Sequence, residues 1–184
     1  MTSREESTVF GFTGNPTGIF SIFLGIVTLR ARKSLSTEAN KSLPKDSPQL
    51  AATLAQFGMR LLQLKVYTGA EPILRASLTI REKKEPDDWR TFNTRSMLGG
   101  ALLGQKKYAD AEPLLSTGYE GMKAREKNPG NDVARLAMKI RIPEAVDRLI
   151  ALYTALEHPD GVKKWTVVKA ELPKTESPKS VEKK

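Results

Sequence analysis

The eight residues YTGAEPIL at positions 67–74 return almost unchanged as YADAEPLL at positions 108–115. The offset of 41 positions also pairs residues outside this octet, because Gly58 matches Gly99 and the small Ser77 matches the small Gly118. Self-similarity at a period of about 20 to 50 residues is typical of chains that stack copies of one supersecondary unit. The duplicated octet therefore predicts a repeat architecture.

Hydrophobic spacing predicts that each unit is a hairpin of two helices. Apolar residues of the first unit recur at intervals of three and four: Leu50, Leu54, Phe57, Leu61 and Leu64. This is the stripe of an amphipathic helix. Ser47 and Pro48 suit the N-cap and first helical position, and Asp87 or Asp88 offers a cap before the second unit. A second helix follows a short turn and begins near Tyr67.

Small residues are placed where the two helices of a unit would meet. Gly58 and Gly99 lie in the middle of the first helices, opposite Ala70 and Ala111 of the second helices. A glycine inside a helix costs about 1 kcal/mol relative to alanine. We expect close packing of the two backbones to offset this cost.

These residues resemble the tetratricopeptide repeat in the longer form found in kinesin light chains. The shared pattern is a glycine in the first helix, an aromatic residue opening the second, and then AEPxL. The stretch PDDWRTFNTRSMLGGALLGQKKYADAEPLL is similar to repeats attached to large bacterial serine/threonine protein kinases of the eukaryotic type. The resemblance implies an all-α fold, a tetratricopeptide-type right-handed superhelix of antiparallel helix hairpins, with about two and a half repeats and capping helices.

The repeats divide the chain into three parts. We expect a tetratricopeptide repeat domain over residues 43–172, with repeats at about 48–86 and 89–126 and a degenerate one at 143–172. An insertion at 125–142 precedes the degenerate copy, and irregularity of this kind is expected of a terminal unit. Residues 173–184 contain one valine among charges, prolines and hydroxyls, and predict a disordered basic tail.

Residues 1–42 predict an apolar helix followed by a basic linker. One interpretation is that the helix caps the first repeat. The other is a membrane anchor, because residues 9–29 are 21 uncharged residues followed by the basic RARK. The stretch KSLSTEANKSLPKDSP also resembles the tail of a preceding repeat whose first half is missing.

Composition argues against several functional classes. The net charge of +9 is concentrated outside residues 46–162, which carry 17 positive and 15 negative side chains, so a nucleic-acid-binding face is not expected. The chain has no cysteine, and its one histidine, His158, lies in the turn-like EHPDG. No kinase signature or phosphate-binding loop is present. We therefore expect no enzyme activity, no metal site and no cofactor.

The predicted function is a non-catalytic protein–protein interaction scaffold that binds a partner protein or peptide through the concave face of its repeats. The candidate groove residues lie off the packing stripe of the first helices: Gln56, Met59, Gln63, Asn93, Ser96, Met97 and Gly100. This lining is polar and methionine-bearing, and only Asn93 suits the clamp with which some tetratricopeptide domains hold a terminal carboxylate. The alternative is a regulatory fragment of a repeat-bearing serine/threonine kinase that lacks its catalytic domain. We expect a cytoplasmic protein, tethered to a membrane if residues 9–29 span one, and a homodimer if an apolar end face stays uncovered.

Overall fold

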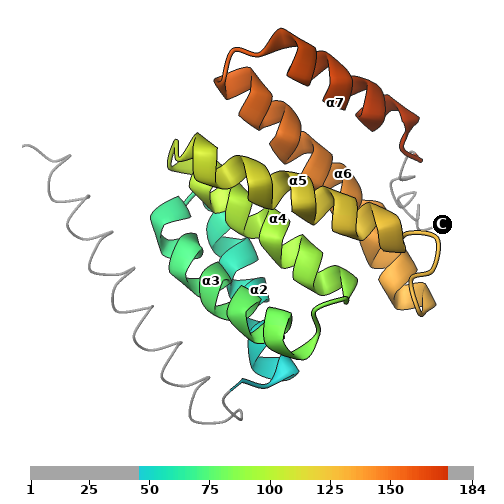
Figure 1. The fold of residues 1–184 in the computed structure, drawn as a ribbon. Coiled ribbons are helices and arrows are strands. Elements are labelled where there is room, and N and C mark those ends of the chain that lie inside the picture. The colour runs from blue at the N-terminus through green and yellow to red at the C-terminus, as the bar shows by residue number, and fades with distance from the viewer. Residues whose placement is uncertain (1–45, 174–184) are drawn as a thin grey trace, which may run out of the picture. The chain divides into compact units, whose positions relative to one another are not determined.

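The structure is a computed structural model that describes residues 46–173, and within them the chain folds into three helical hairpins. Their helices are α2 (Pro48–Gln63) with α3 (Tyr67–Lys84), α4 (Trp89–Gly104) with α5 (Tyr108–Arg125), and α6 (Asp132–Ala155) with α7 (Pro159–Glu171). Successive hairpins lie side by side (Figure 1). The first helices α2, α4 and α6 also contact one another in that order. The predicted all-α fold of helical hairpins is confirmed. The proposed cap or anchor at residues 9–29 lies outside the described residues.

Caps and turns set the limits of the helices. Ser47 Oγ accepts a hydrogen bond from the backbone N–H of Leu50 at 3.1 Å, and Asp88 caps α4 in the same manner. Each hairpin then turns through one residue with positive φ: Lys65 at 57°, Lys106 at 62° and Glu157 at 53°. The third hairpin therefore keeps the turn of the first two, although its sequence has diverged.

The third hairpin begins earlier than the sequence indicates. The first helix expected from residue 143 begins inside the insertion instead, because α6 starts at Asp132 and runs through Pro143. Asn131 caps this start, because its Oδ1 accepts from the backbone N–H of Ala134 at 2.8 Å. Met138 and Ile142 are buried against Met122 of α5, and this packing holds the added turns in place.

Within each of the first two hairpins, the last leucine of the octet covers the glycine of the first helix. A Cβ atom added at Gly58 would lie 2.5 Å from Leu74 Cδ2, and one at Gly99 would lie 2.7 Å from Leu115 Cγ. Both leucines are fully buried. The two glycines thus occupy matching places, as predicted, although the nearest side chain is the leucine and not the alanine.

A second close contact recurs at the same offset. Ser77 Oγ donates to the backbone carbonyl of Ala51 at 2.7 Å. The residue that matches Ser77 is Gly118, where an added Cβ would lie 2.9 Å from the carbonyl oxygen of Phe92. Ala51 and Phe92 are themselves 41 positions apart. In each of the first two hairpins, the small residue of the second helix therefore faces the equivalent backbone carbonyl of the first helix.

The glutamate of the octet connects each hairpin to the next. Glu71 accepts hydrogen bonds from Gln105 Nε2 at 2.8 Å and from Lys107 Nζ at 3.0 Å. Its counterpart Glu112 accepts from Tyr153 Oη at 2.6 Å. The octet thus supplies both the packing inside a hairpin and the polar link between neighbouring hairpins, which accounts for its duplication.

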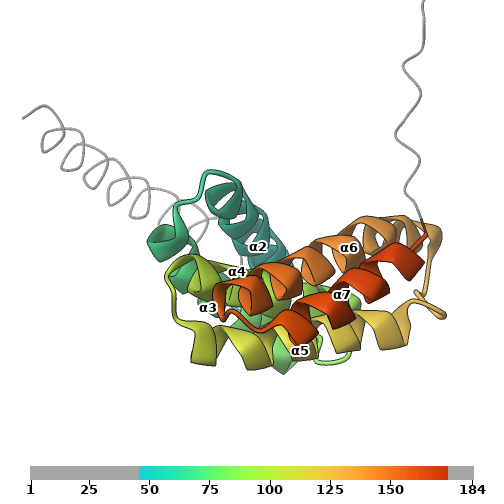
Figure 2. The same cartoon turned by 90° about the horizontal axis from the view of Figure 1, so that it is seen from above.

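Aromatic contacts complete the stack. The ring of Tyr67 lies over Gly104 of the next hairpin, where an added Cβ would come within 2.3 Å of it. Figure 2 shows α7 beside α6 and above α5. Tyr119 of α5 meets Trp165 of α7 edge to face, with ring centroids 5.0 Å apart. The third hairpin is therefore fixed to the second through both of its helices.

The Glu71 link predicts a dependence of stability on pH. Burial alone would raise the pKa of the Glu71 carboxyl, but hydrogen bonds from Lys107, Gln105 and Arg75 outweigh it and lower the pKa from 4.5 to about 2. Since the folded pKa lies below the unfolded one, this contribution is complete above pH 4.5 and is lost as the pH falls to about 2. We expect Glu71→Gln to cost about 1 kcal/mol at neutral pH and to flatten the loss of stability in that window. Urea unfolding at several pH values measures both effects.

The matched control is Glu120→Gln, which changes an exposed carboxylate of α5. We expect it to leave both the stability at neutral pH and its pH dependence close to those of the unmodified protein. If the free energy of unfolding fell equally with pH in Glu71→Gln and in the unmodified protein, the assignment of the link to Glu71 would be contradicted.

Candidate functional site

The face formed by α2, α4 and α6 carries two adjoining hollows. The larger, which we call the wide hollow, has a volume of about 510 Å³. Its apolar side is formed by Met59 and Leu62 of α2 and Leu103 of α4, and its charged side by residues of α6: Glu144, Asp147 and Arg148. The wide hollow therefore offers apolar surface along one side and charged groups along the other.

The second, or narrow, hollow has a volume of about 290 Å³. Gln56, Met59, Asn93 and Met97 line it together with three arginines from three different helices: Arg81, Arg90 and Arg141. Met59 lines both hollows, so they adjoin at this side chain. We call the residues that line either hollow the groove face.

Six of the seven candidate groove residues lie on the groove face. Met59, Gln63 and Gly100 line the wide hollow, and Gln56, Asn93 and Met97 line the narrow one with Met59. Ser96 lines neither hollow and is fully buried. Its Oγ accepts from Arg148 Nη1 at 3.1 Å, because α6 packs across this part of α4. Asn93 and Met97 are also largely buried, at 9% and 3% exposed.

Sequence reasoning missed the charged part of the lining. We expected a polar and methionine-bearing groove, but Arg81 enters from the end of α3, and Arg141, Glu144, Asp147 and Arg148 enter from α6. The degenerate third unit hid the α6 residues, since its alignment to the first two copies was ambiguous. Arg141, Glu144 and Arg148 are three and four positions apart, and this spacing was the sequence signal that they share one helix face.

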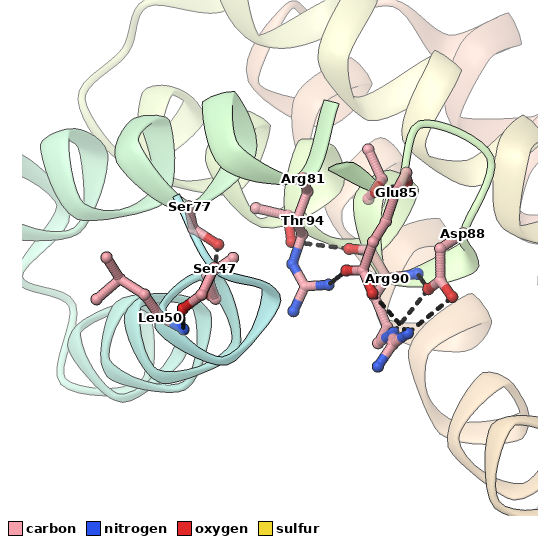
Figure 3. A network of polar contacts seen from close by, with 10 residues as sticks. Ser47, Leu50, Ser77, Arg81, Glu85, Asp88, Arg90 and Thr94 are labelled. Atoms are coloured by element: carbon pink, nitrogen blue, oxygen red, sulfur yellow. Dashed lines mark hydrogen bonds and ion pairs between the residues drawn. The ribbon is translucent and has the colours of Figure 1, made fainter. Parts of the chain in front are cut away.

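Arg81 and Arg90, which line the narrow hollow, converge on the carboxylate of Glu85 (Figure 3). Arg81 Nη1 lies 2.9 Å from Glu85 Oε2, and Arg90 Nη2 lies 3.0 Å from Glu85 Oε1. Arg90 Nε also pairs with Asp88 Oδ1 at 2.7 Å. Hydrogen bonding to Asp88 raises the pKa of Arg90, whereas burial lowers the pKa of Arg81. Both guanidinium groups are held in place by carboxylates.

The third arginine of the narrow hollow is neutralised in the same way. Arg141 Nη1 lies 2.9 Å from Oε1 of Glu144, which also lies 3.5 Å from Arg148 Nη2 through its Oε2. Each arginine of the narrow hollow is therefore paired with a carboxylate, and Glu144 is shared between Arg141 and Arg148. Within residues 46–173, no group of three or more histidine or acidic side chains is placed to hold a metal ion.

The first hairpin identifies the repeat. Residues 50–88, which include α2 except its first two residues and all of α3, match the tetratricopeptide repeat family. This stretch is therefore similar to one tetratricopeptide repeat. No curated protein matches it. The second hairpin repeats the glycine–leucine and small-residue contacts of this tetratricopeptide unit at an offset of 41, so α4 and α5 are a second copy of the same design.

No helix within residues 46–173 combines the length and apolar character that a membrane crossing requires.

Proposed function

We propose that this chain binds a protein partner through the groove face of its tetratricopeptide repeats. Tetratricopeptide repeats generally mediate protein–protein interaction, and stacked helical repeats present long surfaces suited to peptides. The observation that carries the proposal is that α2, α4 and α6 jointly line two adjoining hollows. A bound segment lying across them would contact all three hairpins.

The chemistry of the groove face suits a peptide. Its apolar side includes Met59, which lines both hollows, and methionine is an adaptable contact residue because its side chain is unbranched and polarizable. Glu144, Asp147 and Arg148 supply polar groups along the opposite side of the wide hollow. Such a combination of apolar surface and a few placed polar groups is typical of binding sites.

A pair of tryptophan substitutions tests the proposal. Gln56 is an exposed residue of the narrow hollow, whereas Ala76 is an exposed residue of α3 that lines neither hollow. We expect Gln56→Trp to obstruct the groove face and to weaken partner binding at least about tenfold, and Ala76→Trp to leave it unchanged. Quantitative affinity capture with the full-length chain and both variants measures the recovery of each co-purified protein. If no protein depends on Gln56 more than on Ala76, the groove face is not the binding surface.

The kinase-linked alternative stays a prediction. A kinase catalytic domain encoded together with these repeats, or selective binding to an intact kinase in the same capture experiment, would favour it. If the partner is a kinase, we expect it to bind the groove face as well.

A further inference from the structure

Two side chains that line the narrow hollow each carry a fully buried polar atom that has no hydrogen-bond partner among residues 46–173. The two atoms are Nε of Arg81, which is a donor, and Oδ1 of Asn93, which is an acceptor. Both side chains line the hollow, with Arg81 3% and Asn93 9% exposed. Leaving buried polar groups unpaired is unfavourable, so a guest that satisfies both atoms gains affinity from them.

The charge balance of the hollow argues against an anionic guest. Each of its three arginines is paired with a carboxylate: Arg81 with Glu85, Arg90 with Asp88 and Arg141 with Glu144. A carboxylate guest would compete with these acceptors for the guanidinium donors. It would also leave Asn93 Oδ1 without a donor, because an ionised carboxylate can only accept. A cationic guest that carries only donors would leave Arg81 Nε without an acceptor.

We propose that the narrow hollow binds an amide group of the partner, whose carbonyl oxygen accepts from Arg81 Nε and whose N–H donates to Asn93 Oδ1. This inference rests on the proposed function, since it names the chemical group by which a partner enters the groove face. An amide carries a donor and an acceptor side by side. Both atoms are buried, so both side chains must turn before a guest reaches them. The last side-chain torsion of Asn93 is soft, which lets Oδ1 turn toward the hollow, and the long side chain of Arg81 must shift to expose Nε.

Three small planar probes of the same shape distinguish the possible guests. Acetamide carries both donors and an acceptor, acetate carries acceptors only, and acetamidinium carries donors only. In NMR titrations of the ¹⁵N-labelled full-length chain, we expect acetamide to shift the Asn93 side-chain amide and Arg81 Nε–H resonances in a saturable manner. We expect acetate and acetamidinium to bind at least about fivefold more weakly, since each leaves one buried atom unpaired.

Variants of Asn93 test whether the response to acetamide depends on this side chain. Asn93→Leu removes the acceptor at similar size, and we expect it to abolish the response to acetamide. Asn128→Leu, which changes an exposed asparagine beyond the end of α5, is the matched control and should leave the response intact. Asn93→Asp keeps the shape and replaces the amide by a carboxylate, so it should shift the preference from acetamide to acetamidinium even if Asn93→Leu fails to fold.

The source of the amide follows from a fourth probe. N-methylacetamide has the form of a main-chain peptide unit, so binding as tight as that of acetamide assigns the hollow to the partner's backbone. Preference for acetamide assigns it to an asparagine or glutamine side chain. Acetate binding as tightly as acetamide would overturn the proposal, and so would the lack of a saturable response to every probe, which would mean that water alone fills the hollow. Either failure leaves the Gln56-dependent capture of a partner unaffected, so the two proposals are tested separately.

Discussion

Replacement of Gly118 by alanine is expected to destabilise the fold by about 3 kcal/mol. The added Cβ would lie 2.7 Å from the backbone nitrogen of Ser96 and 2.9 Å from the backbone oxygen of Phe92. Backbone atoms cannot rotate away as a side chain can, so α4 and α5 must separate. The gain in helix propensity, about 1 kcal/mol, is too small to compensate. Urea unfolding of the full-length protein measures the difference.

Gly100→Ala is the matched control for this prediction. An added Cβ at Gly100 would meet Arg148 Cδ at 3.0 Å, and this side chain is long enough to adjust. We expect the change in stability to stay within about 1 kcal/mol, because improved helix propensity offsets the adjustment. Similar effects of Gly118→Ala and Gly100→Ala would show that α5 does not approach the backbone of α4 so closely.

The second large effect on stability is expected when Leu115 is made smaller and Gly99 is made larger. Leu115→Ala empties a fully buried position and should cost about 4 kcal/mol. Gly99→Ala alone places its Cβ 2.7 Å from Leu115 Cγ and should cost about 2 kcal/mol. In the double variant, the new Cβ occupies space that Leu115 has vacated. We therefore expect the double variant to be more stable than the sum of the single effects predicts, by about 2 kcal/mol.

A double-mutant cycle measured by denaturant unfolding gives this coupling directly. Leu98→Ala combined with Gly118→Ala is a suitable reference pair, since the nearest atoms to a Cβ at Gly118 belong to Ser96 and Phe92 and not to Leu98. Strict additivity of Leu115→Ala and Gly99→Ala would contradict the contact between these two residues.

The repeat and its packing were predictable because short sequence patterns determine them and because these patterns occur in two copies. The offset of 41 is enough to place Gly58 and Gly99 in matching helices. Ser47 is a recognisable cap, whereas the sequence leaves Asp87 and Asp88 equally suitable, and the structure assigns the cap to Asp88. The spacing of three and four predicts Leu64 in the apolar stripe of the first helix, but Leu64 follows the end of α2 and is 71% exposed. A periodic pattern alone could not show where the helix ends.

The third hairpin was harder to predict because distant packing decides its limits. Pro143 suggested a helix start, as proline is favoured in the first turn and unfavourable in the interior. Burial of Met138 and Ile142 against α5 extends the helix past Pro143 instead. The charged side of the groove face depends on where this helix packs. The spacing of Arg141 and Arg148 along one helix face was therefore not enough by itself to assign them to the groove.

Site-directed photo-cross-linking tests most directly whether the groove face is the binding surface. A photoreactive side chain would be placed in the full-length chain either at Gln63, an exposed residue of the wide hollow, or at Ala76 of α3, outside both hollows. After irradiation with the partner recovered by affinity capture, mass spectrometry locates the cross-links. The proposed function predicts cross-links to the partner from position 63 and none from position 76. Cross-links from position 76 with none from position 63 would contradict it.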